Sequence, residues 1–494
     1  MQFQSFFFLL FFFVTCIVYY AIPGRARRYW LLAVSWMFYL SLSPAYLPYL
    51  FGLILVAYLS GIILERCAMC SQTARKWLLA GLLTAVFSVL AAVKYGNFVV
   101  NNLNFILPKL PFAAVICMPK LLQPVGLSFF TFAAAGYLID VYRGKRSAEK
   151  NIVSFAVFLS FFPTIMSGPI ERSTNFLRQL DECHSFVLNT DRVRHGLLTM
   201  LYGYFLKTML ADRLSGFVAA VFDGYESLGG AVIFLGVLAF GIQLYCDFAG
   251  ISSIAQGAGE VMGFSLIQNF ETPYFSMSVA EFWRRWHISL SSWFRDYLYI
   301  PLGGNRKGRI RKYINLMVVF LVSGVWHGAG WNYIAWGGLN GAYQVAGDLL
   351  KPARQRLATL LHIDVNNTGN RFLRMAFTFL LINFSWLFFR ASSFTVALQM
   401  LRHGVSNLQM WQLFDGTLLN LGLDFPDVLV LFVSLVAMIL ISVSQYKQQD
   451  WKKSLMEQGF AFRALVYIVF ILAVLVFGIY GSAYSASSFI YVDF

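Results

Sequence analysis

The chain has 494 residues, of which 59% are hydrophobic and only 12% are charged. Because soluble domains carry about 25% charged residues, this composition excludes an ordinary soluble fold and indicates an integral membrane protein. The formal net charge of +15 could also indicate a nucleic-acid surface, but the basic residues lie between apolar runs, as in the positive-inside pattern of membrane proteins. We therefore expect membrane lipids as partners and no nucleic acid.

Long apolar runs recur along nearly the whole chain, so we expect one integral membrane domain over residues 1–494. The runs are continuous and do not alternate every second residue, which favours transmembrane helices over the strands of a barrel. On a window of about twenty residues, the predicted spans are 3–22, 29–46, 47–64, 77–93, 97–107, 124–142, 151–166, 196–221, 229–249, 313–330, 331–350, 372–390, 427–446 and 463–483.

The first apolar segment, from Phe6 to Ala21, has no Lys or Arg before it, and its charges follow at Arg25, Arg27 and Arg28. A cleaved signal peptide has a positively charged region in front of its apolar stretch. The pattern therefore predicts an uncleaved first span whose N-terminus lies outside the cytoplasm.

The run 151–166 is too short to cross a membrane alone. Pro163, and Gly168 followed by Pro169, fall within or just after it. These residues predict a broken or re-entrant element, which a membrane tolerates only where other protein covers it. Asp140 and Asp247 lie at or in neighbouring apolar runs, and each could pair with an arginine or polarise a histidine. Structural pairing is the simpler expectation.

The segment 250–312 is polar and aromatic, and we expect shallow helices at the cytoplasmic face. Within it, apolar residues from Phe282 to Tyr297 follow helical spacing and predict one face of an amphipathic helix over 281–299. An adjoining polar, cationic stripe consists of Arg284, His287, Ser291 and Arg295. Such a stripe suits a phosphate-bearing donor beside a membrane, and it equally suits anionic headgroups. The glycine-rich stretch 301–308 lacks the P-loop pattern and predicts a tight turn.

His327 ends an apolar run and opens the sequence Trp-His-Gly-Ala-Gly-Trp. An ionisable residue at membrane depth is expensive, so function is the default hypothesis. The alternative is a histidine at a helix end that bonds to a carbonyl. Gly324 and Gly328 are four residues apart, as are Gly337 and Gly341, which predicts two closely packed helices.

The last basic cluster, Lys447 to Lys453, should lie in the cytoplasm. The helix that follows would then deliver the C-terminus to the outside. Because both ends are expected outside, the number of crossings should be even, and we expect about twelve. The longest extracytoplasmic loop is expected at 400–426.

These residues resemble the membrane-bound O-acyltransferase (MBOAT) family, and most closely the membrane subunit of bacterial systems that O-acetylate alginate and related polysaccharides. The resemblance covers a catalytic core over 124–344 and extends through 371–391. It rests on the stretches 124–132 with 137–144, 161–170, 245–250, and 282–306 with 325–328.

The resemblance implies a ring of helices around a thinned centre, with donor and acceptor arriving from opposite faces. It also implies that His327 is the central catalytic histidine and that His287 occupies the family's second position. The ending Phe489-Ile-Tyr-Val-Asp-Phe494 is similar to a C-terminal motif whose tyrosine, here Tyr491, is a proposed acyl relay. Val492 departs from that motif, and an aromatic belt at the membrane interface is an equal alternative.

The expected chemistry is acetyl transfer from cytoplasmic acetyl-CoA, across a bacterial inner membrane, to an extracytoplasmic polysaccharide such as alginate. An SGNH-type acetyltransferase outside the membrane would be the partner. His327 would act as the base, and His287 would orient the donor or polarise its thioester carbonyl, with Arg284, Ser291 and Arg295 binding the donor. We expect no metal and no permanently bound cofactor. The alternatives are D-alanyl transfer from a carrier protein to a cell-wall polymer, and a transporter or flippase.

Overall fold

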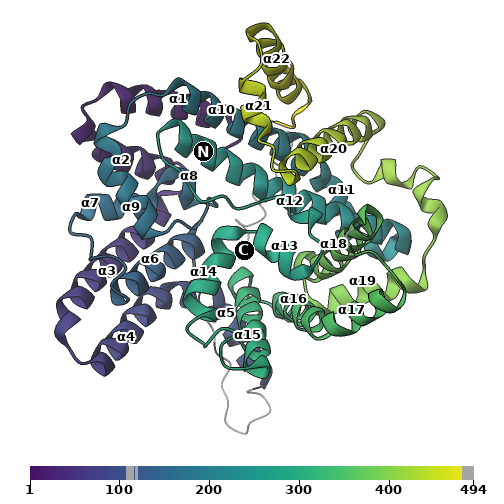
Figure 1. Ribbon diagram of the computed structural model, residues 1–494, viewed down its shortest axis with the longest axis horizontal. Coiled ribbons are helices and arrows are strands. Elements are labelled where there is room, and N and C mark those ends of the chain that lie inside the picture. Colours follow the sequence, from purple (N-terminus) through teal and green to yellow (C-terminus); the bar gives the residue numbers. More distant parts are fainter. Residues whose placement is uncertain (107–115, 117–118, 120, 366, 481–494) are drawn as a thin grey trace. The chain divides into compact units, whose positions relative to one another are not determined.

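A computed structural model describes residues 1–106, 116, 119, 121–365 and 367–480. All regular secondary structure among these residues is helical, as expected of an all-α membrane protein (Figure 1). Six helical stretches are long and apolar enough to cross a membrane: Pro44–Met69, Gln72–Ile106, Gly230–Val261, Thr368–Arg390, Phe425–Tyr446 and Phe460–Phe477. Two shorter helices, Phe6–Ala21 and Leu127–Tyr142, are also apolar. The expected twelve crossings and the ring of helices stay predictions.

Contacts divide the chain into two compact units. The first consists of Met1–Leu197 and Ala255–Ile267, and the second of Leu198–Ile254 and Gln268–Phe494. The single integral membrane domain over 1–494, with its core at 124–344, stays a prediction.

The helices of the first unit follow the apolar runs of the sequence. They are α1 (Phe6–Ala21), α2 (Arg27–Leu40), α3 (Leu47–Arg66), α4 (Gln72–Leu90), α5 (Gly96–Ile106), α6 (Leu127–Tyr142), α7 (Ile152–Ser160), α8 (Phe162–Ile165) and α9 (Ser173–Glu182), followed by α10 (Thr190–Tyr204), which continues into the second unit.

Two predictions for the first unit have different outcomes. The separate spans 77–93 and 97–107 are wrong, because a π-helical turn at Ala91–Tyr95 joins α4 to α5 in one continuous helix. Such a turn absorbs an extra residue without ending the helix. The broken element at 151–166 is confirmed: Phe161, with ψ of 116°, separates α7 from α8, and Pro163 lies in the first turn of α8.

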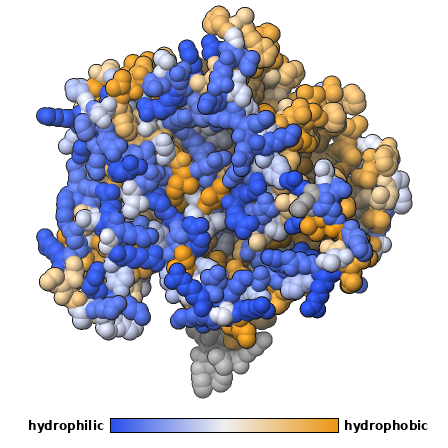
Figure 2. Space-filling view, viewed as in Figure 1, coloured by the Kyte–Doolittle hydropathy of each residue, from blue (hydrophilic) through white to orange (hydrophobic). Residues whose placement is uncertain are grey.

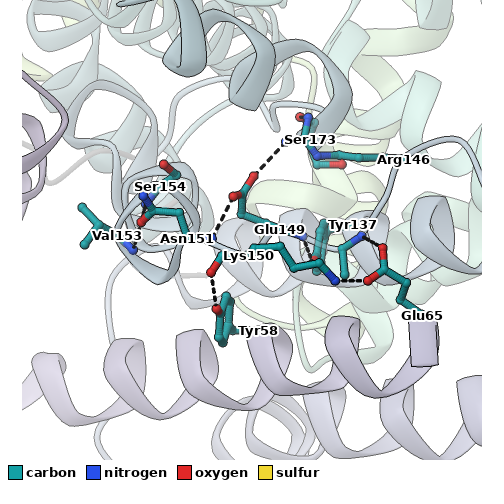
Figure 3. Close-up of polar contacts among 11 residues, drawn as sticks. Tyr58, Glu65, Tyr137, Arg146, Glu149, Lys150, Asn151, Val153, Ser154 and Ser173 are labelled. Atoms are coloured by element: carbon teal, nitrogen blue, oxygen red, sulfur yellow. Dashed lines mark hydrogen bonds and ion pairs between the residues drawn. The ribbon is translucent and has the colours of Figure 1, made fainter. Parts of the chain in front are cut away.

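The basic loop between α6 and α7 is held in a network of polar contacts (Figure 3). Glu65 at the end of α3 accepts the backbone N–H of Ala148 at 3.0 Å and also binds Lys150. The hydroxyl of Tyr137 accepts the N–H of Glu149 at 3.0 Å. The basic loop is therefore fixed by contacts with α3 and α6.

The second unit contains the end of α10, a π-helical segment at Phe205–Ala211, and most of the remaining helices. These are α11 (Asp212–Asp223), α12 (Gly230–Val261), α13 (Val279–Arg285), α14 (Ile288–Phe294), α15 (Arg309–His327), α16 (Trp331–Leu349), α17 (Lys351–Leu360), α18 (Thr368–Arg390), α19 (Phe394–Ser406), α20 (Phe425–Tyr446), α21 (Trp451–Met456) and α22 (Phe460–Phe477). The last turns of α12 belong to the first unit.

Several predicted boundaries move in this unit. The polar segment does not begin at 250, because α12 continues to Val261. Its small residues permit the extension: a Cβ on Gly250 would lie 2.8 Å from the carbonyl oxygen of Gly203, so the helices pack backbone to backbone. The predicted loop 400–426 begins later, since α19 runs to Ser406. The tight turn at 301–308 is confirmed, with positive φ at Gly303, Gly304 and Gly308.

The helices α20 and α22 expose hydrophobic side chains on most of their surface (Figure 2, upper right). Only 6% of α22 is buried. Large apolar surfaces of this kind are stable in lipid but not in water. Both helices therefore have the character of lipid-facing membrane spans.

Candidate active site

The segment predicted as one amphipathic helix over 281–299 is in fact two short helices and a π-helical turn. The hydroxyl of Ser278 caps α13 by accepting the N–H of Glu281 at 3.2 Å. The helix then ends at Arg285, because His287 has φ of 46° in the left-handed region. The prediction of a continuous helix is wrong, and the regular polar stripe across it is lost.

The left-handed conformation of His287 is held by Asn269, which the sequence reading missed. The Asn269 carbonyl accepts the N–H of Ile288 at 2.9 Å, and its side-chain oxygen accepts the hydroxyl of Ser289 at 2.6 Å. Its amide donates to the hydroxyl of Ser252 on α12 at 2.9 Å. Non-glycine residues adopt positive φ rarely, and mostly where surrounding structure fixes them.

The break turns the His287 side chain into the interior, where only 1% of the residue is exposed. Its ring meets Phe248 of α12 edge to face, with centroids 4.6 Å apart. Burial lowers the pKa of His287 to about 3. A neutral imidazole has one N–H donor and one acceptor nitrogen, so at neutral pH it can polarise a carbonyl or receive a proton.

His327 is the last residue of α15, and it too is buried. Three aromatic rings surround it: Trp326 at 4.7 Å, Trp336 of α16 at 4.8 Å and Phe389 of α18 at 5.4 Å between centroids. Trp326 also lies 6.0 Å from His287. The two histidines predicted as catalytic therefore share one indole ring as a neighbour.

Glycines bring α15 and α16 together behind His327, as the sequence predicts (Figure 1, green). A Cβ on Gly324 would lie 2.3 Å from the carbonyl oxygen of Tyr333, and a Cβ on Gly337 would lie 2.3 Å from that of Phe320. No real side chain fits at such a distance. The close approach fixes where α15 ends, and so where its terminal histidine lies.

Asn340 of α16 connects this helix to α13 and α18, and it was not among the residues predicted from the sequence. Its side-chain oxygen accepts the indole N–H of Trp283 on α13 at 3.1 Å. Its amide donates to the carbonyl of Trp336 at 2.9 Å and to the hydroxyl of Ser385 on α18 at 3.2 Å. A fully bonded buried amide of this kind fixes helix register, because leaving any of its bonds unmade is costly.

A second buried polar cluster lies near this site and contains Asp247, the residue before Phe248. Lys207 Nζ, in the π-helical segment, is 2.7 Å from an oxygen of Asp247 and 2.7 Å from one of Asp212. All three side chains are buried. The expectation that Asp247 pairs structurally is confirmed, with a lysine as its partner. Asp140 lies 3.9 Å from Lys145.

Comparison with known proteins identifies the family. The model of the membrane-bound O-acyltransferase family matches residues 50–394. The chain belongs to this family. It is 35% identical to a "probable alginate O-acetylase" of Pseudomonas putida over 85% of this chain and 83% of that one.

Two further relatives are similar to smaller parts of the chain. A peptidoglycan O-acetyltransferase of Helicobacter pylori is 32% identical over 76% of this chain and 73% of its own. A teichoic acid D-alanyltransferase of Streptococcus thermophilus is 31% identical over 46% of this chain and 58% of its own. The chain is accordingly an O-acyltransferase and a multi-pass membrane protein.

Among the remaining predicted site residues of this MBOAT enzyme, Ser291 adjoins the buried pair, because its backbone N–H donates to the carbonyl of His287 at 2.9 Å. Arg284 is exposed on α13, and the side chain of Arg295 is 65% exposed and bonds to Asp296 at 2.9 Å. The hydroxyl of Ser291 donates to the carbonyl of Trp286 at 3.2 Å. Tyr491 lies outside the described residues and outside the family match.

Proposed function

We propose that this MBOAT enzyme takes acetyl groups from cytoplasmic acetyl-CoA and passes them across a bacterial inner membrane for O-acetylation of a polysaccharide such as alginate. The observation that carries the proposal is the pair of buried histidines, His287 and His327, which share Trp326 as a neighbour. The similarity to alginate O-acetylases over most of the chain supports the acceptor class.

His327 is the general base of the proposed reaction. It removes the proton of an acceptor hydroxyl while the oxygen attacks the thioester carbonyl of the donor. The C–S bond then breaks, and the leaving thiolate takes the proton back from the imidazolium. A positioned base contributes about 10²–10⁴-fold to such a step.

His287 is the polarising group of the same reaction. Because its ring is neutral at physiological pH, it can donate one N–H to the thioester oxygen as negative charge develops there. Arg284 and Arg295 are exposed cations that suit the phosphates of the donor, and Ser291 would bind beside them. The acceptor hydroxyl belongs to Tyr491 or to an SGNH-type partner outside the membrane.

The decisive variant is His327→Ala, with His184→Ala as a matched control because His184 is an exposed histidine of the same chain. Membranes containing each variant are supplied with radiolabelled acetyl-CoA, and label in polysaccharide is counted. We expect His327→Ala to lose about 10²–10⁴-fold and His184→Ala to keep full activity. Folding of the His327→Ala protein is verified by size-exclusion chromatography. Transfer at the wild-type rate by this folded protein would refute the assignment of His327 as the general base.

The similarity to a D-alanyltransferase supports one alternative donor, a carrier protein that holds a D-alanyl group. D-alanyl transfer needs a charged carrier protein, whereas the proposed reaction needs only acetyl-CoA. Supplying acetyl-CoA to purified wild-type enzyme with its acceptor separates these donors. The alginate O-acetylases resemble far more of this chain than the D-alanyltransferase does, which favours acetyl-CoA.

A further inference from the structure

The helix α17 has an apolar face that no part of the described protein covers. Leu350, Ala353, Leu357, Leu360 and Leu361 follow helical spacing and lie within an arc of about 100°. All are exposed, with Leu357 at 54% and Leu360 at 74%. Four exposed leucines on one stripe would be unfavourable in water, so the stripe has an apolar partner.

Cations border this stripe on both sides. On a helical wheel, Arg354 lies next to Leu361 at one edge, and Arg356 lies next to Leu360 at the other. Lys351 lies further around, and Gln355 and Thr359 occupy the opposite face. An apolar stripe with flanking cations is typical of helices that lie in the surface plane of an anionic membrane.

The start of α15, which lies beside the end of α16, is also positively charged. Asp348, three residues before α17, bonds to Lys312 of α15 at 2.8 Å and to the hydroxyl of Tyr313 at 2.9 Å. This pairing brings the start of α15 to the end of α16 (Figure 1). The exposed cations at that end are Arg306, Lys307, Arg309 and Arg311, in addition to those of α17.

The position of α17 in the chain also points to a membrane surface. The candidate membrane span α18 begins at Thr368, and the seven residues after Leu360 reach at most about 25 Å. Basic residues gather on the cytoplasmic side of membrane proteins, where the leaflet holds anionic lipids. The positive charge at the end of α16 and the short distance from α17 to α18 therefore both indicate the anionic membrane surface as the partner of α17.

We propose that α17 lies in the plane of the membrane surface, with its leucines among lipid acyl chains and Arg354 and Arg356 on the phosphates of anionic lipid headgroups. One nitrogen of Arg354 bonds to the carbonyl of Gly347 at 2.7 Å, which holds the exposed guanidinium beside the end of α16. The helix is thereby a lipid-binding surface that adjoins α16, the helix that carries Trp336 and Asn340 beside the active site.

The first test places the photoreactive residue p-benzoylphenylalanine at Leu357, and separately at Gln355 on the opposite face as a matched control. After irradiation in membranes of phosphatidylethanolamine and phosphatidylglycerol, the adducts are identified by mass spectrometry. We expect phospholipid adducts at position 357 and several-fold fewer at position 355. A cross-link to a second copy or to another protein, or equal yields at both positions, would overturn the proposal.

The second test addresses the headgroup contact. From the same membranes, the double variant Arg354→Gln/Arg356→Gln should retain less phosphatidylglycerol after purification, by about fivefold for each charge, with unchanged phosphatidylethanolamine. The double lysine variant, which keeps both charges, should behave as wild type. Unchanged phosphatidylglycerol in the glutamine variant would remove the arginines from the proposal. Acetyl transfer is measured separately, so failure here leaves the proposed reaction intact.

Discussion

His287 shows how a single backbone angle converts a surface residue into a buried one. If the helix continued through it, its side chain would share a face with exposed Arg284 and Arg295. The left-handed turn directs it instead toward Phe248 and Trp326. Residue type and an apolar setting were enough to select His327 from the sequence, whereas the role of His287 was implied by the resemblance to the MBOAT family. The turn itself was not predictable, because its cause is Asn269, whose bonds form only in the folded protein.

The low pKa of His287 predicts a pH-dependent stability. A histidine in an unfolded chain has a pKa of about 6.5, whereas burial lowers that of His287 to about 3. Its contribution to stability is therefore fully present above pH 6.5 and declines as the pH falls toward 3. His287→Asn tolerates the same backbone angle and does not titrate.

The measurement is the thermal midpoint of purified protein in detergent, recorded from pH 7.5 to pH 4.5. We expect the wild-type midpoint to fall more steeply with acid than that of His287→Asn. Parallel slopes for the two proteins would show that the ring is not buried as a neutral group.

At the scale of elements, α15 and α16 form the most closely packed pair in the site. The glycine spacing predicted that pair because close approach needs the absence of a Cβ, which is a property of residue type alone. In contrast, α17 was not predicted, since Lys351, Arg354 and Arg356 lower the mean hydropathy of any window that contains its leucines. The joined helix α4–α5 was missed because Lys94 and Asn97 interrupt the hydropathy but not the helix.

A single methyl group should therefore disturb the site when it is added at the contact. In Gly337→Ala the new Cβ meets the carbonyl of Phe320, and overpacking of this kind costs about 1–3 kcal/mol. Thermal stability and acetyl transfer should both fall. Gly347→Ala on the same helix is the control, because nothing lies within 4 Å of its new Cβ, and its midpoint should stay the same or rise. Identical midpoints for both variants would contradict the packing.

For the whole molecule, composition established membrane class and helical architecture, but it did not establish the number of crossings. The predicted spans 313–330 and 331–350 coincide with α15 and α16, but neither helix is among the six apolar spans of the described residues. Both contain buried asparagines, Asn315 and Asn340, whose side chains bond within the protein. Such helices are stabilised by one another, and hydropathy measures only their affinity for lipid.

The distribution of basic residues still predicts an orientation, with both termini outside the cytoplasm. Alkaline phosphatase fused after Phe494 should be active, since the enzyme folds only outside, and a fluorescent protein at the same point should stay dark. A fusion placed at Lys447 should give the reverse pattern. Bright fluorescence at the C-terminus would require an odd number of crossings if the N-terminus is outside.

The ion cluster of Lys207, Asp212 and Asp247 has a consequence for biogenesis. The ribosome completes Lys207 and Asp212 well before it reaches Asp247, so the emerging segment lacks one of its two counter-charges. An ionised side chain that enters hydrocarbon without its partner is expensive. Release of the segment that contains Lys207 and Asp212 from the translocon should therefore wait until α12 has been synthesised. That segment and α12 should then enter the membrane together. Premature termination before α12 would then expose the ammonium to quality-control proteases.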